Sequence, residues 1–86
     1  MKLLEKSLKA LANKRRLEIL RFLNKEKEAS VSDIARTINL SFKSTSRHLA
    51  VLSSADIVER EQRSLQVFYS LTKTPDSIVR HVLGLL

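Results

Sequence analysis

Leucines recur at helical spacing near the start of the chain. Between Lys2 and Ala12 they form one apolar stripe on an otherwise charged segment, at positions 3, 4, 8 and 11, which is typical of an amphipathic helix. Asn13 is a suitable helix cap, and a second apolar face follows at Leu17, Ile19, Leu20, Phe22 and Leu23. The pattern leaves open whether these segments form one bent helix or two. The stretch Lys25–Glu28 has no periodic apolar residue and is expected to be a solvated end.

The following segment, "ASVSDIARTINLS", predicts a short buried helix and a tight turn. Its apolar residues follow the i, i+3, i+4, i+7 pattern of one helix face at Val31, Ile34, Ala35 and Ile38. Ser30 followed by Asp33 resembles a capping box. Asn39 tolerates the left-handed conformation in which helices commonly end. Leu40 is expected to plug the turn, and Ser41 to cap the next helix.

The helix after Ser41 separates its apolar and polar residues onto two sides. At ~100° per residue, the core stripe consists of Thr45, Leu49 and Leu52. Small, hydroxylated or cationic side chains lie opposite, at Lys43, Ser44, Arg47 and Ala50, with Ser46 at the flank. The N-terminal half of such a helix also presents free backbone N–H groups and a positive dipole end, both suited to phosphate. The two helices together predict a helix-turn-helix.

Beyond Ser54 the apolar residues alternate as in β-strands. Ile57–Arg60 predicts one strand, and the alternation at Leu65, Val67, Tyr69 and Leu71 predicts a second with one apolar face. The segment "EQRS" between them predicts the turn. The polar side chains of this hairpin are Arg60, Gln62, Arg63 and Gln66. A hairpin after a recognition helix is a wing, placed to meet the DNA backbone or minor groove.

A last helix is predicted at the end of the chain. We expect Thr74 as its N-cap, Pro75 as its first residue and Asp76 near its positive dipole end. Its apolar residues are unusually many for a terminal segment, at Ile78, Val79, Val82, Leu83, Leu85 and Leu86.

Composition narrows the class of protein. The 86 residues predict one domain, 1–86, and the 43% of apolar residues predict a folded chain. Sixteen Lys and Arg against nine acids give a net charge of +7, which favours a polyanion such as nucleic acid, although solubility alone is the simpler explanation. The chain has no cysteine, and no run approaches the ~18 apolar residues of a membrane span. We expect a cytoplasmic protein without a signal peptide.

The predicted fold is mainly α with a small β-hairpin, a winged helix-turn-helix. The phrases "LANKRRLEILRFL", "VSDIARTINLSFKSTSRHLAVLSSADIVE" and "VFYSL" resemble ArsR/SmtB-type winged helix-turn-helix transcriptional repressors. The most specific of them is "STSRHLAVL" with the later "A.IV". The resemblance covers nearly the whole chain. It implies a homodimer that binds an inverted-repeat operator and represses transcription, with the first and last helices forming the dimer interface.

The chain departs from this family at its metal-sensing positions. Metal-sensing members often carry Cys-x-Cys-Asp where this chain has Ser30-Val31-Ser32-Asp33. A second family site uses Asp-x-His and later ligands in the terminal helix, where this chain has Asp76-Ser77-Ile78 and a lone His81. We therefore expect no metal and no cofactor, and the effector is unknown. Two smaller departures are Asp56 and Gln62, both at positions where the family favours glycine.

Two sets of residues are predicted to contact partners. The DNA-binding set is Ser41, Lys43, Ser44, Ser46, Arg47, His48, Arg60, Gln62 and Arg63. The dimer set is Leu3, Leu4, Leu8, Leu11, Ile78, Val82, Leu83 and Leu86. Simpler alternatives stay open: Lys43 and Arg47 as solvated charges, Ser44 and Ser46 as surface polar residues, His48 as a packing residue, and the leucine stripe closing on its own core. For Arg15 and Arg16 two interpretations stay open, a contact with phosphate and pairing with Glu18 or solvent.

The predicted partners are double-stranded DNA and a second copy of the chain, with no membrane. No thiol, glycine-rich phosphate loop or paired histidines appear, so we expect no enzyme activity. The main alternative is a winged-helix module for protein–protein docking. A membrane-surface protein is the more distant one, since it would need a continuous basic amphipathic helix.

Overall fold

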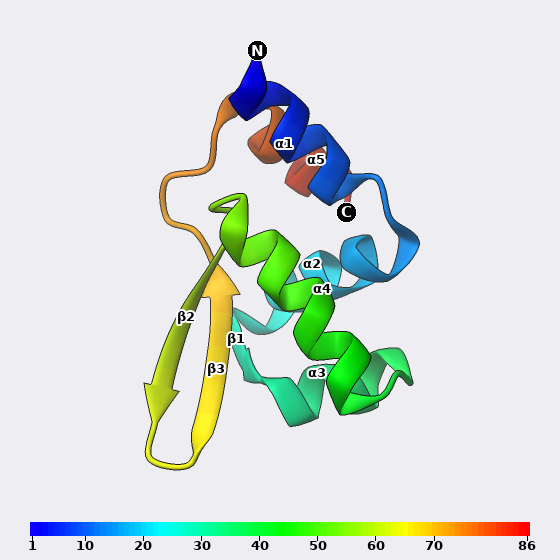
Figure 1. Cartoon of the computed structure of the whole chain (residues 1–86), viewed down its shortest axis with the longest axis vertical. Helices are drawn as coiled ribbons and strands as arrows, with labels where there is room; N and C mark the ends of the chain where they lie inside the picture. The colour runs from blue at the N-terminus through cyan, green and yellow to red at the C-terminus, as the bar shows by residue number, and fades with distance from the viewer.

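The computed structural model describes residues 1–86, which form helices and a small sheet. In chain order the elements are α1 (Lys2–Leu11), α2 (Lys14–Glu26), β1 (Glu28–Ser30), α3 (Val31–Ile38), α4 (Phe42–Ser54), β2 (Val58–Arg63), β3 (Gln66–Leu71) and α5 (Ser77–Leu85). In Figure 1, α1 and α5 lie together at one end, the β2–β3 hairpin projects at the other, and α4 crosses the front. The predicted fold class, a mainly helical winged helix-turn-helix, is confirmed.

Three of the expected helix caps form. The side-chain oxygens of Asn13, Ser30 and Ser41 accept from the backbone N–H groups three residues later, at 3.1, 3.1 and 3.0 Å. Each bond satisfies a backbone donor that has no partner inside the helix. The cap at Asn13 also separates α1 from α2, which settles the question that the sequence pattern left open.

The start of α5 differs from the prediction, which had placed the cap at Thr74. The N-cap is Asp76, whose Oδ1 accepts from the Val79 N–H at 2.9 Å, and the helix begins at Ser77. Asp76 Oδ2 also accepts from the buried Ser7 hydroxyl of α1 at 2.9 Å. A carboxylate that satisfies partners in two helices outcompetes the threonine hydroxyl two positions earlier. Pro75 therefore precedes the helix instead of opening it.

The helix-turn-helix turn follows the prediction. Asn39 adopts the left-handed conformation, with φ 57° and ψ 53°. The N–H groups of Asn39 and Leu40 then bond to the carbonyls of Arg36 and Ala35, at 3.3 and 3.0 Å. Leu40 is partly buried against the core, as expected for the residue that plugs the turn.

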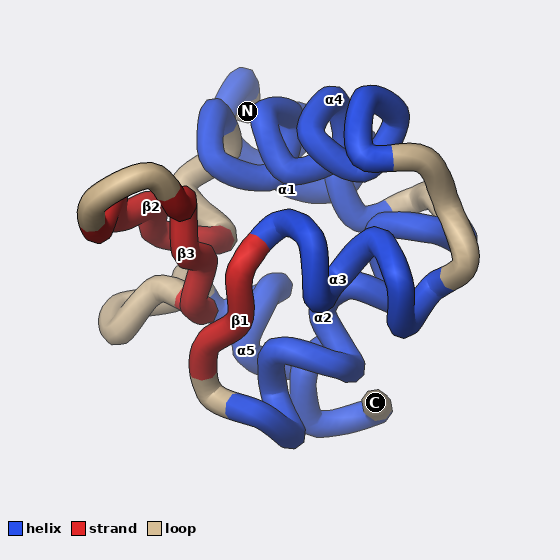
Figure 2. The backbone as a smooth tube through the Cα atoms, turned by 90° about the horizontal axis from the view of Figure 1, so that it is seen from below, coloured by secondary structure: helices blue, strands red, loops and turns tan.

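The sheet contains a strand that the sequence pattern does not reveal. It is three-stranded, with order β1-β3-β2 and both pairs antiparallel. Figure 2 shows it along one side of the helices. In β1, Ala29 pairs with Tyr69 of β3. Three residues are too few to show a period of two, and Glu28 had been placed in a solvated end. The strand exists because β3 offers it backbone partners.

The wing turn is shorter than the predicted segment Glu61–Ser64 and lies at the end of that segment. Strand β2 continues to Arg63, which pairs with Gln66, so the turn consists of Ser64 and Leu65. Ser64 takes the left-handed backbone, with φ 56°. Leu65, expected on the apolar face of the second strand, is 96% exposed. Before the hairpin, Asp56 adopts φ 57°, a conformation that an aspartate tolerates better than most residues.

The core collects the apolar faces of the helices and the inner face of the sheet. The predicted stripe of α4, Thr45, Leu49 and Leu52, is fully buried. Leu11 is only 5% exposed and belongs to the same core cluster. Its assignment to the dimer set is therefore corrected: α1 contacts α2 and α4 as well as α5, and the burial of Leu11 leaves little of its side chain for a partner.

Candidate DNA-binding surface

The outer face of α4 carries the cations that the sequence placed there. Lys43 and Arg47 are exposed, and Ser44 and Ser46 are partly exposed. Neither cation forms an ion pair or a hydrogen bond within the chain. The Ser41 oxygen accepts the capping bond from Ser44 N–H, which leaves its hydroxyl proton free to donate. This face combines free cations, hydroxyl donors and a helix N-terminus, the groups that bind phosphate and base edges.

His48 lies at the border of this face, partly buried. Its Nδ1 is 3.2 Å from Nη1 of Arg16, a residue at the start of α2. Burial first, then the positive charges of Arg16 and Arg15, lower the pKa of His48 below its ordinary value of 6.5. The ring is therefore neutral near neutral pH and is held by a neighbouring helix.

Arg15 is occupied within the chain. Its Nη1 lies 3.2 Å from the Glu18 carboxylate and donates to the Ile38 carbonyl oxygen at 2.7 Å. The alternative of pairing with Glu18 is confirmed for this residue. The second bond ties the start of α2 to the end of α3, next to the helix-turn-helix turn, so Arg15 supports that turn instead of facing solvent freely.

The strand register divides the predicted wing residues between two faces. Side chains alternate along a strand, and the buried Val58 and Tyr69 define the inner face. Arg60 and Gln62 follow Val58 at steps of two and share this face, beyond the edge of the core. Arg63 lies on the outer face. The sequence grouped Arg60, Gln62, Arg63 and Gln66 as one polar hairpin. The strand register instead places Arg60 and Gln62 on one face and Arg63 and Gln66 on the other.

Arg63 is engaged by two acids and one ring. Its guanidinium donates to both carboxylate oxygens of Glu28 at 2.8 and 2.7 Å and to Glu61 at 2.8 Å. It also lies over the Phe68 ring, 4.6 Å from its centroid, in the range of a cation–π contact. Hydrogen bonds from Arg63 lower the pKa values of Glu28 and Glu61. A phosphate would have to compete with these two carboxylates for the guanidinium.

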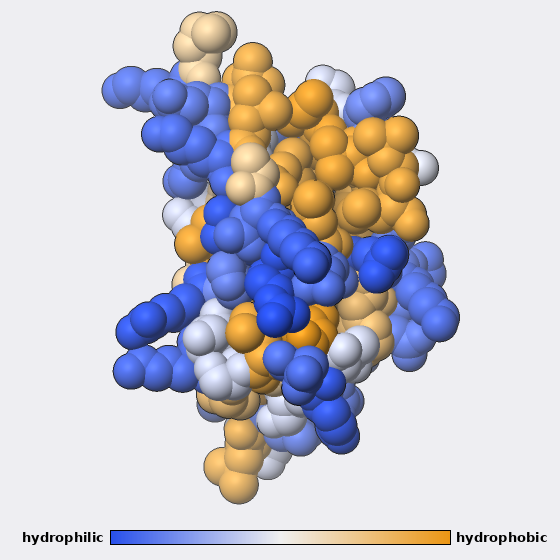
Figure 3. Space-filling model, turned by 90° about the vertical axis from the view of Figure 1, so that its right-hand side faces the viewer, coloured by the Kyte–Doolittle hydropathy of each residue, from blue (hydrophilic) through white to orange (hydrophobic).

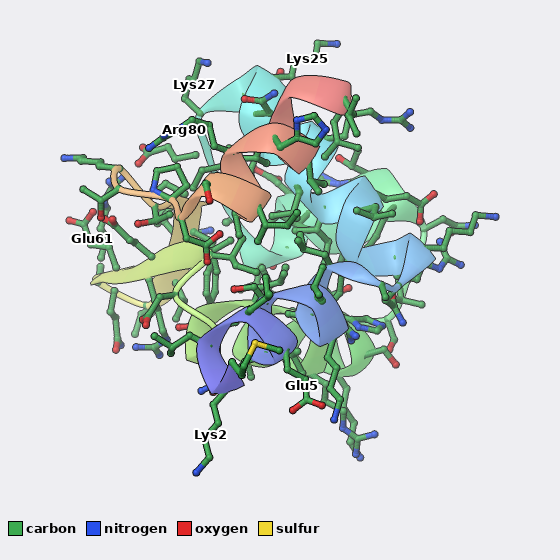
Figure 4. The ribbon with its side chains drawn as sticks, turned by 90° about the horizontal axis from the view of Figure 1, so that it is seen from above. Lys2, Glu5, Lys25, Lys27, Glu61 and Arg80 are labelled. Atoms are coloured by element: carbon green, nitrogen blue, oxygen red, sulfur yellow. The ribbon has the colours of Figure 1, made fainter.

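Not all cations of the chain lie beside α4. In Figure 4, Lys25, Lys27 and Arg80 gather on the side of the molecule opposite Lys2 and Glu5. They come from the end of α2, the residue that follows it, and α5. The positive charge of the chain therefore spreads over more than one face. The local arrangement on α4, and not the net charge, singles out the candidate surface.

A separate apolar area covers α1 and α5. Figure 3 shows it at the end of the molecule that holds these two helices. Its most exposed large side chains are Met1, Leu3, Leu4, Leu8, Leu85 and Leu86. Ile78, Val82 and Leu83 of the predicted dimer set are partly buried against the core. No helix in the structure is both long enough and apolar enough to cross a bilayer.

Three features of the surface escaped the sequence analysis. Phe42, the first residue of α4, is 60% exposed, and its aromatic side chain at a helix start was the only available signal. Arg16 reaches α4 from another helix, and Glu28 reaches Arg63 from another strand. No local pattern encodes either contact. No group of three or more His, Asp or Glu residues in the chain is arranged to hold a metal ion.

Comparison with known proteins points to one family. Residues 13–60 match the family described as "Bacterial regulatory protein, arsR family". The transcriptional activator HlyU of Vibrio cholerae serotype O1 is 40% identical over 67 residues, which span 78% of this chain and 61% of that protein. The structure of reduced HlyU from Vibrio cholerae N16961 matches with a TM-score of 0.84 at 34% identity, covering 99% of this chain and 85% of that one.

Two further solved structures share the fold. A homodimeric winged helix-turn-helix DNA-binding domain from Mycobacterium bovis, a possible ArsR-family regulator, has a TM-score of 0.84 at 27% identity, covering 98% of this chain and 75% of that one. The transcriptional repressor PagR of Bacillus anthracis has a TM-score of 0.76 at 27% identity, covering 95% and 93%. The match to a family of transcriptional regulators agrees with the prediction that the chain is not an enzyme.

Proposed function

The chain belongs to the arsR family of bacterial regulatory proteins, and we propose that it binds double-stranded DNA as a homodimer and represses transcription from an inverted-repeat operator. In this proposal residues 1–86 act as one winged helix-turn-helix domain. Helix α4 enters the major groove, the wing meets the backbone, and α1 and α5 join two copies.

The observation that carries the proposal is the two-sided character of α4. Thr45, Leu49 and Leu52 are fully buried, while Lys43 and Arg47 project on the opposite side without an acidic partner. A recognition helix needs a rigid anchor on one side and donors for phosphate and base edges on the other. A docking module for another protein would not require unpaired cations at this position.

The dimer rests on the apolar area over α1 and α5. Leu3 is 81% exposed, Leu8 46% and Leu85 72%, and they lie on adjoining helices. Exposed apolar side chains gathered in one area usually mark an interface. A second copy is the chosen partner because the related Mycobacterium bovis domain is described as homodimeric. In a dimer with a two-fold axis, the two α4 helices would meet two half-sites related by the same axis. Such half-sites form an inverted repeat.

Repression is the simplest outcome, since a bound dimer excludes other proteins from the same DNA. The Vibrio cholerae relative is described as an activator, and activation would require the operator to lie where the bound dimer promotes transcription instead of blocking it. Two measurements separate repression from activation. One maps the bound site relative to the start of transcription, and the other compares transcript levels before and after deletion of the gene. Lower transcript levels in the deletion strain would contradict repression.

Phe42 extends the proposed recognition surface. An exposed apolar ring at the first position of a recognition helix matches the C5-methyl group of thymine, which apolar side chains contact in the major groove. Replacing individual operator thymines by deoxyuridine removes only that methyl group. We expect one such replacement to weaken DNA binding by the parent protein and to leave DNA binding by a Phe42→Ala variant unchanged. Equal losses for both proteins would refute the contact.

The experiment that tests the function is selection of bound DNA from a random pool. Binding to DNA should enrich a short motif, and a symmetric dimer should enrich it as an inverted repeat. Recovery of the motif as a single half-site would contradict the dimeric arrangement. Failure to enrich any sequence would contradict specific DNA binding and would favour the docking module.

A further inference from the structure

One guanidinium near the start of α2 joins α1 to α4. Arg16 Nε donates to the Ala10 carbonyl oxygen at 2.6 Å, and Nη2 donates to the Lys9 carbonyl oxygen at 3.2 Å. These carbonyls belong to the last turn of α1, where intrahelical donors are missing. The remaining nitrogen, Nη1, lies 3.2 Å from His48 Nδ1 on α4. Backbone atoms of α1 therefore hold the guanidinium in place beside the histidine.

This contact determines which ring nitrogen carries the proton. A guanidinium has only donors and stays charged, so His48 Nδ1 must be the acceptor. A neutral imidazole with an unprotonated Nδ1 carries its proton on Nε2. Protonation of both nitrogens would place two cations 3.2 Å apart. The lowered pKa of His48, caused by burial and by Arg16 and Arg15, agrees with the neutral ring.

We propose that Arg16 is a positioning residue that fixes His48 as an Nε2–H donor to a phosphate oxygen of the bound DNA. The proposal rests on the proposed function, because it requires α4 to lie against DNA. His48 follows the exposed Arg47 on α4 and is itself partly exposed, so its free nitrogen has access to the surface. A neutral N–H of fixed direction supplies a hydrogen bond to phosphate without adding a charge.

The tautomer is tested without DNA. In proton–nitrogen NMR spectra at about pH 8, well above the ordinary histidine pKa, His48 should show an unprotonated Nδ1 and a protonated Nε2. His81, which is exposed, is the internal reference and should show averaged tautomers. Arg16→Ala, and to a lesser degree Arg16→Lys, should move His48 toward that average while the thermal melt remains cooperative. A protonated Nδ1 or an averaged ring in the parent protein would overturn the proposal.

The donor is tested with two substitutions that leave Arg16 intact. The amide nitrogen of glutamine falls near the position of Nε2, and that of asparagine near Nδ1. His48→Asn should therefore weaken DNA binding about tenfold more than His48→Gln, the scale of one hydrogen bond to a charged group. Neither change should alter the salt dependence, because no charge is removed. Equal losses for the two variants, or a shallower salt dependence, would overturn the donor role.

The two failures can be told apart. If the parent protein enriches no DNA motif in the random-pool selection, the proposed function fails, and the phosphate contact fails with it. The other case is that the parent protein binds its motif, but its His48 tautomers are averaged or the two His48 variants lose DNA affinity equally. Only the role given to Arg16 and His48 then fails.

Discussion

Arg63 and Glu28 form a two-pronged ion pair across 35 positions of sequence, with N–O distances of 2.8 and 2.7 Å. The pair joins the far end of β2 to β1, over the strand that lies between them. With Glu61 as a second acceptor, the cluster holds two carboxylates and one guanidinium. The wing cation that the sequence assigned to DNA is thus already committed to neighbours, and its contact with DNA requires an exchange of partners.

This exchange predicts opposite effects of two substitutions. Arg63→Ala should weaken binding about equally on all DNA sequences and make the log–log salt dependence shallower by about one unit, because one phosphate contact is lost. Glu28→Gln should strengthen binding, because a competing carboxylate is removed. Glu26→Gln, the same change of charge at the exposed end of α2, is the control. An unchanged salt dependence for Arg63→Ala, or equal effects of the two glutamine variants, would show that Arg63 serves only the wing.

The exposed face of α4 predicts a sequence-dependent loss. Arg47→Ala should cost roughly 1–3 kcal/mol of binding free energy if its guanidinium contacts a base, and should relax the preference at one operator position. Arg80→Ala removes the same charge from α5 and should weaken binding less, with no change of preference. Titrations on the selected motif and on its single-base variants measure both. Binding by Arg47→Ala equal to that of the parent protein would refute the assignment of this face.

The apolar area over α1 and α5 predicts the assembly. Leu8→Glu should convert a dimer into a monomer, because it places a charge within the proposed interface. Leu65→Glu introduces the same residue at the wing turn, where the leucine is 96% exposed, and should leave the dimer intact. Val82 is a poorer choice because it packs on the core. Sedimentation at micromolar concentration gives the mass, and a monomeric parent protein would contradict the proposed dimer.

The buried side of α4 predicts contrasting changes of stability. Leu49→Ala removes buried volume and should lower the free energy of unfolding by about 2–5 kcal/mol, with DNA binding lost only through unfolding. The Thr45 hydroxyl is buried and has no hydrogen-bond partner. Thr45→Val keeps the shape and removes the unpaired group, so it should leave stability unchanged or raise it by up to about 1 kcal/mol. Thermal and urea melts measure both changes, and destabilisation by Thr45→Val would contradict the absence of a hydrogen-bond partner for this hydroxyl.

His48 predicts a dependence of stability on pH. Its folded-state pKa lies below the ordinary value of 6.5, chiefly because of burial. The unfolded chain therefore binds the proton more readily, and the free energy of unfolding should fall as pH decreases from about 7 toward the folded-state pKa. The lowered pKa values of Glu28, Glu61 and Asp76 act in the same direction but at lower pH. Free energies of unfolding should be measured over this pH range for the parent protein and for His48→Gln. Their dependence on pH should differ only near the ordinary histidine pKa, and not at the lower pH where the carboxylates titrate.

Local features could be predicted from the sequence. The caps at Asn13, Ser30 and Ser41 and the left-handed Asn39 were predicted because each depends on residues within a few positions. The buried stripe of α4 was predicted because a helix repeats its faces at a constant angle. The position of Thr74 misled the prediction of α5, because Asp76 is secured by Ser7 of α1, a partner 69 positions away. The DNA-binding and dimer assignments themselves remain predictions.

Most helix positions, the buried faces and the two-sided character of α4 could be predicted from the sequence, because these follow from short-range periodicity and capping. Which polar groups contact one another could be seen only in the folded chain. Strand β1 exists through its pairing with β3, Leu11 turns into the core, and Arg63 and Arg16 find Glu28 and His48 on other elements. Such contacts depend on how the elements pack against one another, which no window of neighbouring residues encodes. The cations that remain free to meet DNA are therefore identified by the fold and not by the composition.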